Sequence, residues 1–343
     1  MNDAEIVVVG AGIMGLAAAA ALGRAGRSAT VLEQFAPGHD RGSSHGTARI
    51  FKVSYPDAEF VRLAQESLVR WRELADETGE ELLTTNGTLD VGGIEGRREA
   101  LEECGAGFEF VRAAEIERRF GLKVDGEGLF QPDGAVLHAD RAHEAFIRAA
   151  GGVELAYATP VQELVPDDDA VLVHTAAGDL HARAVVVTAG SWVTRLLAPL
   201  GLAPDVAAVR ETVAYFRPGA AADGPPLSEW RPELGQVTYG LVGRDGLLKV
   251  GVSGSGTPAD PDEPGPADEN VVRSAAAWAA RRYDLLDEAP VRAETRLYTN
   301  RPDERFVVER HGRVIVGSAC SGHGFKFAPA VGARLAALAL EAA

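Results

Sequence analysis

The sequence predicts an α/β fold in which an antiparallel β-rich domain is inserted into a domain of alternating strands and helices. Residues 5–33 predict a strand, a Gly-rich turn, an Ala/Leu-rich helix and a second strand. Residues 313–343 predict another strand, a Gly/Ser loop and a helix, whereas residues 207–252 have the pattern of antiparallel strands. A chain of 343 residues is long enough for two domains.

The first of these units has the pattern of a dinucleotide-binding site, with the motif GAGIMG at residues 10–15. Gly10 allows a tight turn, Gly12 lets a pyrophosphate approach the backbone, and Gly15 lets the helix lie close to the sheet. The phosphates would lie at the positive end of the helix. Glu33 follows at the end of the second strand, where it can accept hydrogen bonds from ribose hydroxyl groups and disfavour a 2′-phosphate. The alternative, a Gly-rich turn in another α/β unit, does not explain why an acidic residue, Glu33, stands at the end of the second strand.

The rest of the chain divides into further elements. Apolar spacing predicts helices at residues 57–76, 140–150, 268–283 and 329–343, and strands at 153–157, 170–174, 184–187, 291–297 and 313–317. Residues 86–137 alternate short strands with polar helical pieces, and the Pro-, Gly- and acid-rich residues 256–270 predict a surface loop. We therefore expect a discontinuous dinucleotide-binding domain at 1–85, 140–205 and 295–343, and a substrate domain at 86–139 and 206–294. This arrangement is more typical of flavoproteins than of nicotinamide dehydrogenases.

Composition excludes several classes of function. The net charge of −16 argues against nucleic acid and anionic membrane surfaces as partners. No run approaches 18 apolar residues, so no membrane span is expected, and the acidic start at Asp3 and Glu5 argues against a signal peptide. Two cysteines, Cys104 and Cys320, are too few for a disulfide framework or a four-ligand zinc site, which fits a reducing cytoplasm.

Lysine is rare in this chain, because Lys52, Lys123, Lys249 and Lys326 are the only four. A lysine in an apolar strand, such as Lys249, or in a Gly-rich loop, such as Lys326, is therefore a candidate functional residue. The residues alone leave alternatives open: a lysine such as Lys249 more often faces solvent from an antiparallel strand than it takes part in catalysis.

Other candidate residues also keep a structural alternative. His323 fits a packing or helix-capping residue, and Cys320 fits a small buried apolar residue or a reactive thiol. Trp71 and Trp192 are expected in the core. No metal site is expected, because His138, Asp140 and His143 fit the start of a helix better than a ligand set.

Six segments carry a resemblance to a known family. They are GAGIMG at 10–15, GSSHGTAR at 42–49, VVVTAGSW at 185–192, LLKVGV at 247–252, LYTNRPDERFVVE at 297–309 and SGHGFKFAPAVG at 321–332. Together they resemble the monomeric sarcosine oxidase and N-methyltryptophan oxidase group of FAD-dependent amine oxidases, which are DAO-type flavoproteins. The resemblance covers nearly the whole chain. It implies a Rossmann-type, glutathione-reductase-like FAD-binding domain with an inserted antiparallel β-rich substrate domain, in a cytoplasmic monomer.

The resemblance also implies roles for individual residues. The catalytic residues would be Lys249, which contacts flavin N5 through water and activates oxygen, Arg49, beside the isoalloxazine, and His323. The substrate-binding residues would be Lys52 and Lys326, which clamp a carboxylate, Gly322, beside the amine, and the pocket walls Tyr239 and Tyr298. The FAD-binding residues would be Gly10, Gly12, Ile13, Met14, Gly15, Glu33, Gln34, Ser43, Ser44, His45, Arg49, Val161, Ala189, Gly190, Trp192, Gly322, Gly324, Phe325 and Lys326.

The sequence departs from the family pattern at three positions. Sarcosine-oxidising members attach the flavin to a cysteine three residues before the threonine of the YT pair, and this chain has Arg296 there. We therefore expect FAD to be bound without a covalent bond. Lys52 replaces an arginine, which keeps the charge but loses the bidentate fork, and Ser253 replaces an expected histidine. These changes leave the identity of the substrate open.

Three functions remain open from the sequence. The favoured one is an FAD-dependent oxidase of a secondary or cyclic amino acid, with hydride transfer from the C–H next to the amine to flavin N5, giving an imine and hydrogen peroxide. Its partners would be a small amino acid or amine and O2. The second is an FAD-dependent amino acid dehydrogenase that uses another electron acceptor. The third is an NAD(P)-dependent reductase, in which the segments at 185–192 and 321–332 would have no role.

Overall fold

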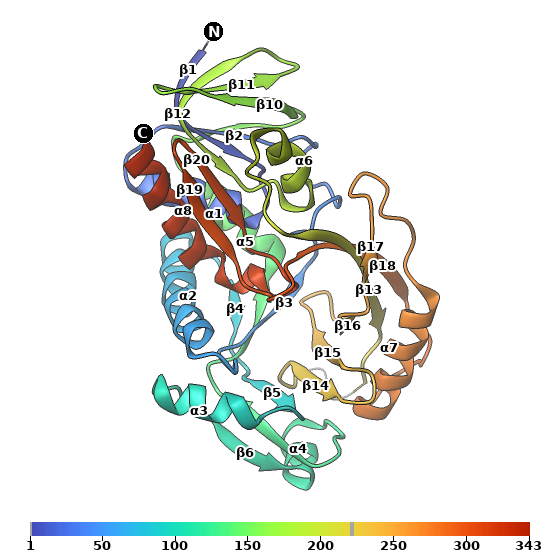
Figure 1. Ribbon diagram of the computed structural model, residues 1–343. Coiled ribbons are helices and arrows are strands. Elements are labelled where there is room, and N and C mark those ends of the chain that lie inside the picture. The colour runs from blue at the N-terminus through green and yellow to red at the C-terminus, as the bar shows by residue number, and fades with distance from the viewer. Residues whose placement is uncertain (1, 220–222) are drawn as a thin grey trace.

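The computed structural model describes residues 2–219 and 223–343 (Figure 1). Residue 1 and residues 220–222 fall within the predicted domain segments 1–85 and 206–294 and lie outside the described residues.

One sheet is built around the first strand of the chain. Its strands are β1 (Asn2–Val9), β2 (Ala29–Leu32), β9 (Glu154–Ala156), β10 (Val161–Pro166), β11 (Val171–Thr175), β12 (Leu180–Val187), β19 (Val307–His311) and β20 (Val314–Ser318). The order is β10-β11-β12-β1-β2-β9, and β20 also pairs with β12. β9, β2, β1, β12 and β20 run parallel, so the two ends of the chain contribute to one sheet. The apolar run of β1 is buried as a parallel strand requires, with Ile6, Val7 and Val8 fully inaccessible.

Four helices gather on one side of this sheet: α1 (Ile13–Arg24), α2 (Ala58–Thr78), α5 (Ala139–Ala149) and α8 (Ala328–Ala342) (Figure 1). α1 is rich in alanine, so its backbone can approach its neighbours closely. Gly332 on α8 meets this surface, because a Cβ atom added to it would lie 2.5 Å from the Cβ of Ala17. Small residues therefore fix the distance between α1 and α8.

A second sheet of nine strands is almost entirely antiparallel. Its strands are β5 (Thr88–Val91), β6 (Glu109–Arg112), β7 (Glu127–Gln131), β13 (Ala207–Phe216), β14 (Leu227–Arg231), β15 (Gln236–Val242), β16 (Leu248–Ser253), β17 (Thr257–Pro258) and β18 (Arg292–Asn300). α7 (Glu269–Arg282) covers it through the fully buried Trp278. α3 (Glu95–Glu103) and α4 (Ala113–Phe120) belong to the same part of the chain, and α6 (Val193–Leu197) follows β12. A three-stranded sheet of β3 (Ala48–Phe51), β4 (Leu83–Thr84) and β8 (Ala135–His138) completes the fold.

The structure confirms the predicted α/β fold with a parallel sheet and a separate antiparallel sheet. β18 crosses the predicted domain boundary between residues 294 and 295, and the three-stranded sheet takes strands from both predicted domains. The division into two domains stays a prediction. In residues 2–219 and 223–343, no helix combines the length and the apolar character that crossing a membrane requires.

The two tryptophans expected in the core differ. Trp71 is fully buried, and its Nε1 donates to the carbonyl oxygen of Lys326 at 2.8 Å. Trp192 is not a core residue, so that expectation was wrong. Its side chain is partly exposed, and its Nε1 donates to the carboxylate of Asp262 at 2.8 Å. The loop at 260–262 therefore contacts Trp192.

Candidate active site

A cavity of about 1200 Å³ is lined by residues of both large sheets. This volume exceeds the roughly 300–1,000 Å³ that one small molecule usually needs, so the cavity has room for two ligands. The predicted site residues that line it are Gly10, Gly12, Ile13, Met14, Glu33, Gln34, Ser43, Ser44, His45, Arg49, Lys52, Val161, Ala189, Gly190, Trp192, Tyr239, Lys249, Tyr298, Gly322, His323, Gly324, Phe325 and Lys326. The fold thus brings these residues together, whereas Gly15 does not line the cavity.

The glycines at the start of α1 have the geometry of a phosphate cradle. Gly10 has a φ of +99°, and a Cβ atom on it would lie 2.6 Å from the Thr188 carbonyl oxygen. A Cβ atom on Gly15 would lie 1.9 Å from the Gly10 carbonyl oxygen, so only glycine allows this close packing. At Gly12 the nearest atom would be the Ser44 hydroxyl at 3.4 Å. Gly12 therefore leaves the end of α1 open to the cavity.

Glu33 closes this end of the cavity. Its side chain is buried and accepts hydrogen bonds from the backbone N–H groups of Ala11 at 2.9 Å and Phe35 at 3.0 Å. The Ser44 hydroxyl accepts from the N–H of Ile13 at 3.1 Å, in the first turn of α1. The acid and the open helix N-terminus thus lie at one end of the cavity, as a ribose and its phosphates require.

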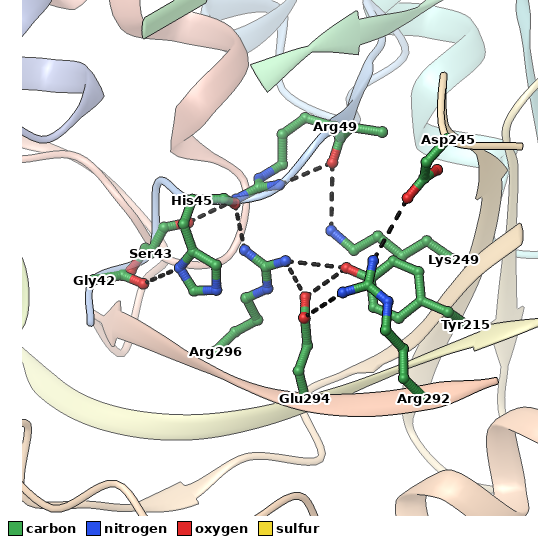
Figure 2. A network of polar contacts seen from close by, with 11 residues as sticks. Gly42, Ser43, His45, Arg49, Tyr215, Asp245, Lys249, Arg292, Glu294 and Arg296 are labelled. Atoms are coloured by element: carbon green, nitrogen blue, oxygen red, sulfur yellow. Dashed lines mark hydrogen bonds and ion pairs between the residues drawn. The ribbon is translucent and has the colours of Figure 1, made fainter. Parts of the chain in front are cut away.

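Three cations and one acid form the group that we call the Lys249 cluster: Arg49, Lys249, Arg296 and Glu294 (Figure 2). Arg49 donates to the backbone oxygens of Ser43 at 2.7 Å, Ala48 at 2.8 Å and His45 at 2.8 Å. Arg296 donates to the same His45 oxygen, to the Tyr215 hydroxyl at 3.0 Å and to Glu294. The Lys249 ammonium donates to the Ala48 oxygen at 3.4 Å.

Burial sets the proton affinities in the Lys249 cluster. The side chain of Lys249 is only 5% exposed, and burial with the neighbouring Arg49 and Arg296 holds its pKa well below the usual value. Burial and Arg296 lower the pKa of Arg49 to about 10. Burial, Arg296 and Arg49 lower the pKa of His45 to about 3, so this imidazole is neutral. A solvent-facing position for Lys249 is therefore wrong.

Lys326 and His323 lie at another part of the cavity. Lys326 is 6% exposed, and its ammonium donates to the carbonyl oxygen of His323 at 2.7 Å. Burial, Lys52 and Arg49 hold the pKa of Lys326 well below the usual value. Burial and Lys326 lower the pKa of His323 to about 3. His323 Nε2 lies 3.1 Å from the Glu304 carbonyl oxygen, which assigns the proton to Nε2, and its buried Nδ1 has no partner in the described part of the chain.

Lys52 has a partner that the sequence did not predict. Its ammonium donates to Asp90 Oδ1 at 2.8 Å, and Arg97 donates to the same oxygen at 2.9 Å. We call this group the Lys326 cluster; it consists of Lys52, Arg97, Lys326 and Asp90. Lys52 is therefore not a free cation that faces Lys326 alone, as a simple two-lysine clamp would require.

Tyr239 and Tyr298 line the same cavity and are hydrogen bonded to each other. Burial raises the pKa of both phenols, so both stay protonated. Glu211 lies close enough to raise the pKa of both tyrosines further. Burial raises the pKa of Glu211 to about 7. The Ser255 hydroxyl lies 3.2 Å from its carboxylate.

Sequence reasoning missed four residues that line the cavity or support it. Tyr55, Arg97 and His143 line it directly, and Asp90 holds two of its cations. Asp90 could have been noticed, because a charged residue interrupts the apolar strand pattern around it. No local pattern marks the other three. Among residues 2–219 and 223–343, no group of three or more His, Cys, Asp or Glu is arranged to hold a metal ion.

Comparison with known proteins gives a consistent result. The model of the FAD dependent oxidoreductase family, DAO, matches residues 5–338. Peroxisomal sarcosine oxidase from Homo sapiens is 32% identical over 98% of this chain and 92% of that protein. Monomeric sarcosine oxidase from Streptomyces avermitilis is 32% identical over 98% of this chain and 93% of that protein. The solved structure of NikD, an unusual amino acid oxidase essential for nikkomycin biosynthesis, matches with a TM-score of 0.90 and 27% identity over 100% of this chain and 95% of that chain.

Proposed function

The chain belongs to the DAO family of FAD-dependent oxidoreductases, and on that premise we propose that it is an oxidase of a secondary or cyclic amino acid. The substrate would lose a hydride from the carbon next to its amine and a proton from nitrogen, giving an imine. Oxygen would take up the two electrons and two protons to give hydrogen peroxide. The observation that carries this proposal is the shared cavity, which joins the start of α1 and Glu33 to Lys249 and Lys326.

The residues of this cavity fit FAD. The open end of α1 at Gly12 and the Ser44 hydroxyl would hold the pyrophosphate, and the Glu33 carboxylate would hold a ribose. FAD supplies a two-electron acceptor when it is bound there. Arg49 and Arg296 would give that acceptor a fixed positive environment, because their guanidinium groups are already oriented by hydrogen bonds.

We propose that FAD is held without a covalent bond. Arg296 occupies the position of the linking cysteine, and hydrogen bonds to His45, Tyr215 and Glu294 engage its guanidinium. Acid precipitation of the purified protein should leave the yellow chromophore in the supernatant. Colour that stays with the denatured polypeptide would contradict this, and Cys320→Ser would then test the thiol that lines the cavity.

The substrate carboxylate would bind to Lys326, beside Lys52. The neutral His323 offers an unpartnered Nδ1 that can accept a hydrogen bond from the substrate amine. Lys326, Lys52 and Arg49 lower the pKa of an amine bound near them, which favours the neutral amine that C–H cleavage needs. These groups would fix the reacting carbon relative to the cofactor.

Lys249 would act on oxygen rather than on the substrate carboxylate. Reduction of oxygen begins with a transfer of one electron that places negative charge on oxygen, and a buried cation stabilises that charge. Each 1.36 kcal/mol of such stabilisation changes the rate about tenfold. We further propose that the protein acts as a cytoplasmic monomer, which its two free cysteines and its similarity to a monomeric sarcosine oxidase support.

Peroxide release tests the proposal. The purified yellow protein should consume oxygen and release hydrogen peroxide in equal amounts with at least one member of a panel of N-methyl and cyclic amino acids. The matching primary amino acids and the decarboxylated amines serve as controls. Reduction of the flavin without peroxide release would instead identify a dehydrogenase, and a colourless protein that uses NAD(P) would contradict the proposal altogether.

A further inference from the structure

The Lys326 cluster holds more positive charge than one amino-acid carboxylate needs. Lys52, Arg97 and Lys326 all line the cavity, and Asp90 is the carboxylate with which Lys52 and Arg97 pair. Lys326 has no ion pair within residues 2–219 and 223–343. One substrate carboxylate paired with Lys326 would therefore leave Lys52 and Arg97 sharing the single carboxylate of Asp90.

The hydrogen-bond donors of the cluster are only partly used. Arg97 donates from Nε to the Gly93 oxygen at 3.2 Å, and from Nη1 to the Ser54 oxygen at 3.1 Å and to Asp90. Its Nη2 has no hydrogen-bond partner in the described ranges. Asp90 does not serve it: Oδ1 accepts from Lys52 and from Arg97 Nη1, and Oδ2 accepts from the Ser54 hydroxyl. Arg97 thus keeps a guanidinium edge for a further acceptor.

Tyr55 provides a second, independent observation. Its side chain lies near both lysines, with the ring centre 5.7 Å from each ammonium nitrogen. Tyr55 is 9% exposed and lines the cavity, and its buried hydroxyl has no partner within residues 2–219 and 223–343. A buried hydroxyl without a partner destabilises the protein unless a ligand supplies the missing hydrogen bond.

The other acids that line the cavity do not neutralise this charge. Asp57 is paired with Arg305 at 2.6 Å, and Asp303 is paired with Arg301 at 3.1 Å. Glu304 also lines the cavity and has no ion pair within the described ranges; it lies near enough to Tyr55 to raise the pKa of that phenol, but it is not among the groups that shift the pKa of Lys52 or Lys326. None of these acids accepts a hydrogen bond from Arg97 Nη2 or from the Tyr55 hydroxyl in the described part of the chain.

We propose that the substrate is an amino acid with a second carboxylate on its side chain, which Arg97 and Tyr55 bind while Lys326 holds the carboxylate next to the amine. The proposal rests on the proposed function for the first carboxylate and names the class of substrate for the same site. The Nη2 edge of Arg97 and the Tyr55 hydroxyl supply the donors, and Asp90 holds Arg97 in place. The substrates are then N-substituted or cyclic amino acids with an acidic side chain.

Binding of an unreactive pair of ligands tests the proposal without turnover. Glutarate and its monoamide have the same length, but only glutarate has two carboxylates. The holoenzyme should bind glutarate about 10- to 100-fold more tightly than the monoamide, as followed through the absorption of the bound flavin. Arg97→Gln should remove this preference, and Tyr55→Phe should reduce it severalfold. Arg97→Lys keeps a cation beside Asp90 but loses the free edge, so it should lose most of the preference and carries the test if Arg97→Gln does not fold.

Turnover then separates this proposal from the proposed function. N-methylglutamate should have a kcat/KM about 10- to 100-fold above that of N-methylglutamine, and Arg97→Lys should bring the two values together. Equal binding of glutarate and its monoamide, or equal weakening of both by Arg97→Lys, would overturn the proposal that the site binds a second carboxylate. Oxidation of neutral N-methyl amino acids with no preference for acidic ones would overturn only this inference. A preference for glutarate in a protein that oxidises no amino acid would overturn the proposed function and leave only a site for a dicarboxylate.

Discussion

The Lys249 cluster and the Lys326 cluster each combine three basic side chains with one acid and reach the same cavity, but they use their hydrogen bonds differently. In the Lys249 cluster, Arg49 and Arg296 donate to backbone oxygens of the segment at 43–48, so the fold itself orients the charge. In the Lys326 cluster, Arg97 keeps a free edge, and Lys326 donates only to His323 in the described part of the chain. The first arrangement is suited to a fixed positive field and the second to binding an anion.

The largest expected difference between the clusters is in the free energy of unfolding that is lost when the acid of each cluster is replaced. Asp90 is 1% exposed and accepts hydrogen bonds from three side chains. Glu294, by contrast, is paired in part with Arg292, which is half-exposed. Asp90→Asn should lower the free energy of unfolding by about 3 kcal/mol, because two cations lose a buried partner. Glu294→Gln should lower it by about 1 to 2 kcal/mol.

Urea denaturation of the two variants measures this difference, with the exposed Glu163→Gln as a control that should change little. Equal losses for Asp90→Asn and Glu294→Gln would contradict the difference in burial that separates the clusters.

Lys326→Met tests which cluster binds the carboxylate. The KM for an amino acid substrate should rise about 10- to 100-fold, because a buried charge-assisted hydrogen bond is lost. The KM for the matching amine without a carboxylate should change much less. If the unmodified enzyme oxidises the decarboxylated amine as well as the amino acid, Lys326 does not hold a carboxylate.

The pH dependence of anion binding gives the smallest effect, at most tenfold for each pH unit. Burial lowers the pKa of Lys326, and the protonated lysine is the form that binds a carboxylate. Affinity should therefore fall as pH rises through this lowered pKa, below the usual lysine range of about 10.4, with a proton taken up on binding. Glutarate binding from about pH 6 to about pH 10 measures it, because neither carboxylate titrates there. In Lys326→Met the fall should be much smaller, and an unchanged profile would assign it to another group.

The sequence predicted the geometry of the glycine turn at residues 10–15 better than the surroundings of Lys52, and the reason is physical. Gly10, Gly12 and Gly15 act through local backbone geometry, which a motif of six residues contains completely. The partner of Lys52 depends instead on the register of β5 in the large sheet, since Asp90 reaches Lys52 only after β3 and β5 have folded. No pattern near Lys52 contains this information.

Lys249 and His323 show the same limit. The strand at 248–253 is compatible with a solvent-facing lysine, and the burial of Lys249 and its hydrogen bond to the Ala48 oxygen appear only in the folded chain. The tautomer of His323 depends on its contact with the carbonyl oxygen of Glu304. Glu304 is a turn residue with a positive φ of 57°. Burial and proton position at the site are thus products of tertiary contacts, whereas the identity of the elements is largely local.

Rapid mixing of Lys249→Met in the two half-reactions tests most directly whether the Lys249 cluster serves oxygen and the Lys326 cluster serves the substrate. Reduction by the substrate is followed without oxygen, and reoxidation is followed after mixing with oxygen, with the exposed Lys123→Met as the control. We expect reoxidation to slow by about two to three orders of magnitude, or about 3 to 4 kcal/mol of barrier, while reduction changes much less. Equal slowing of both half-reactions would contradict the division of tasks between the two clusters.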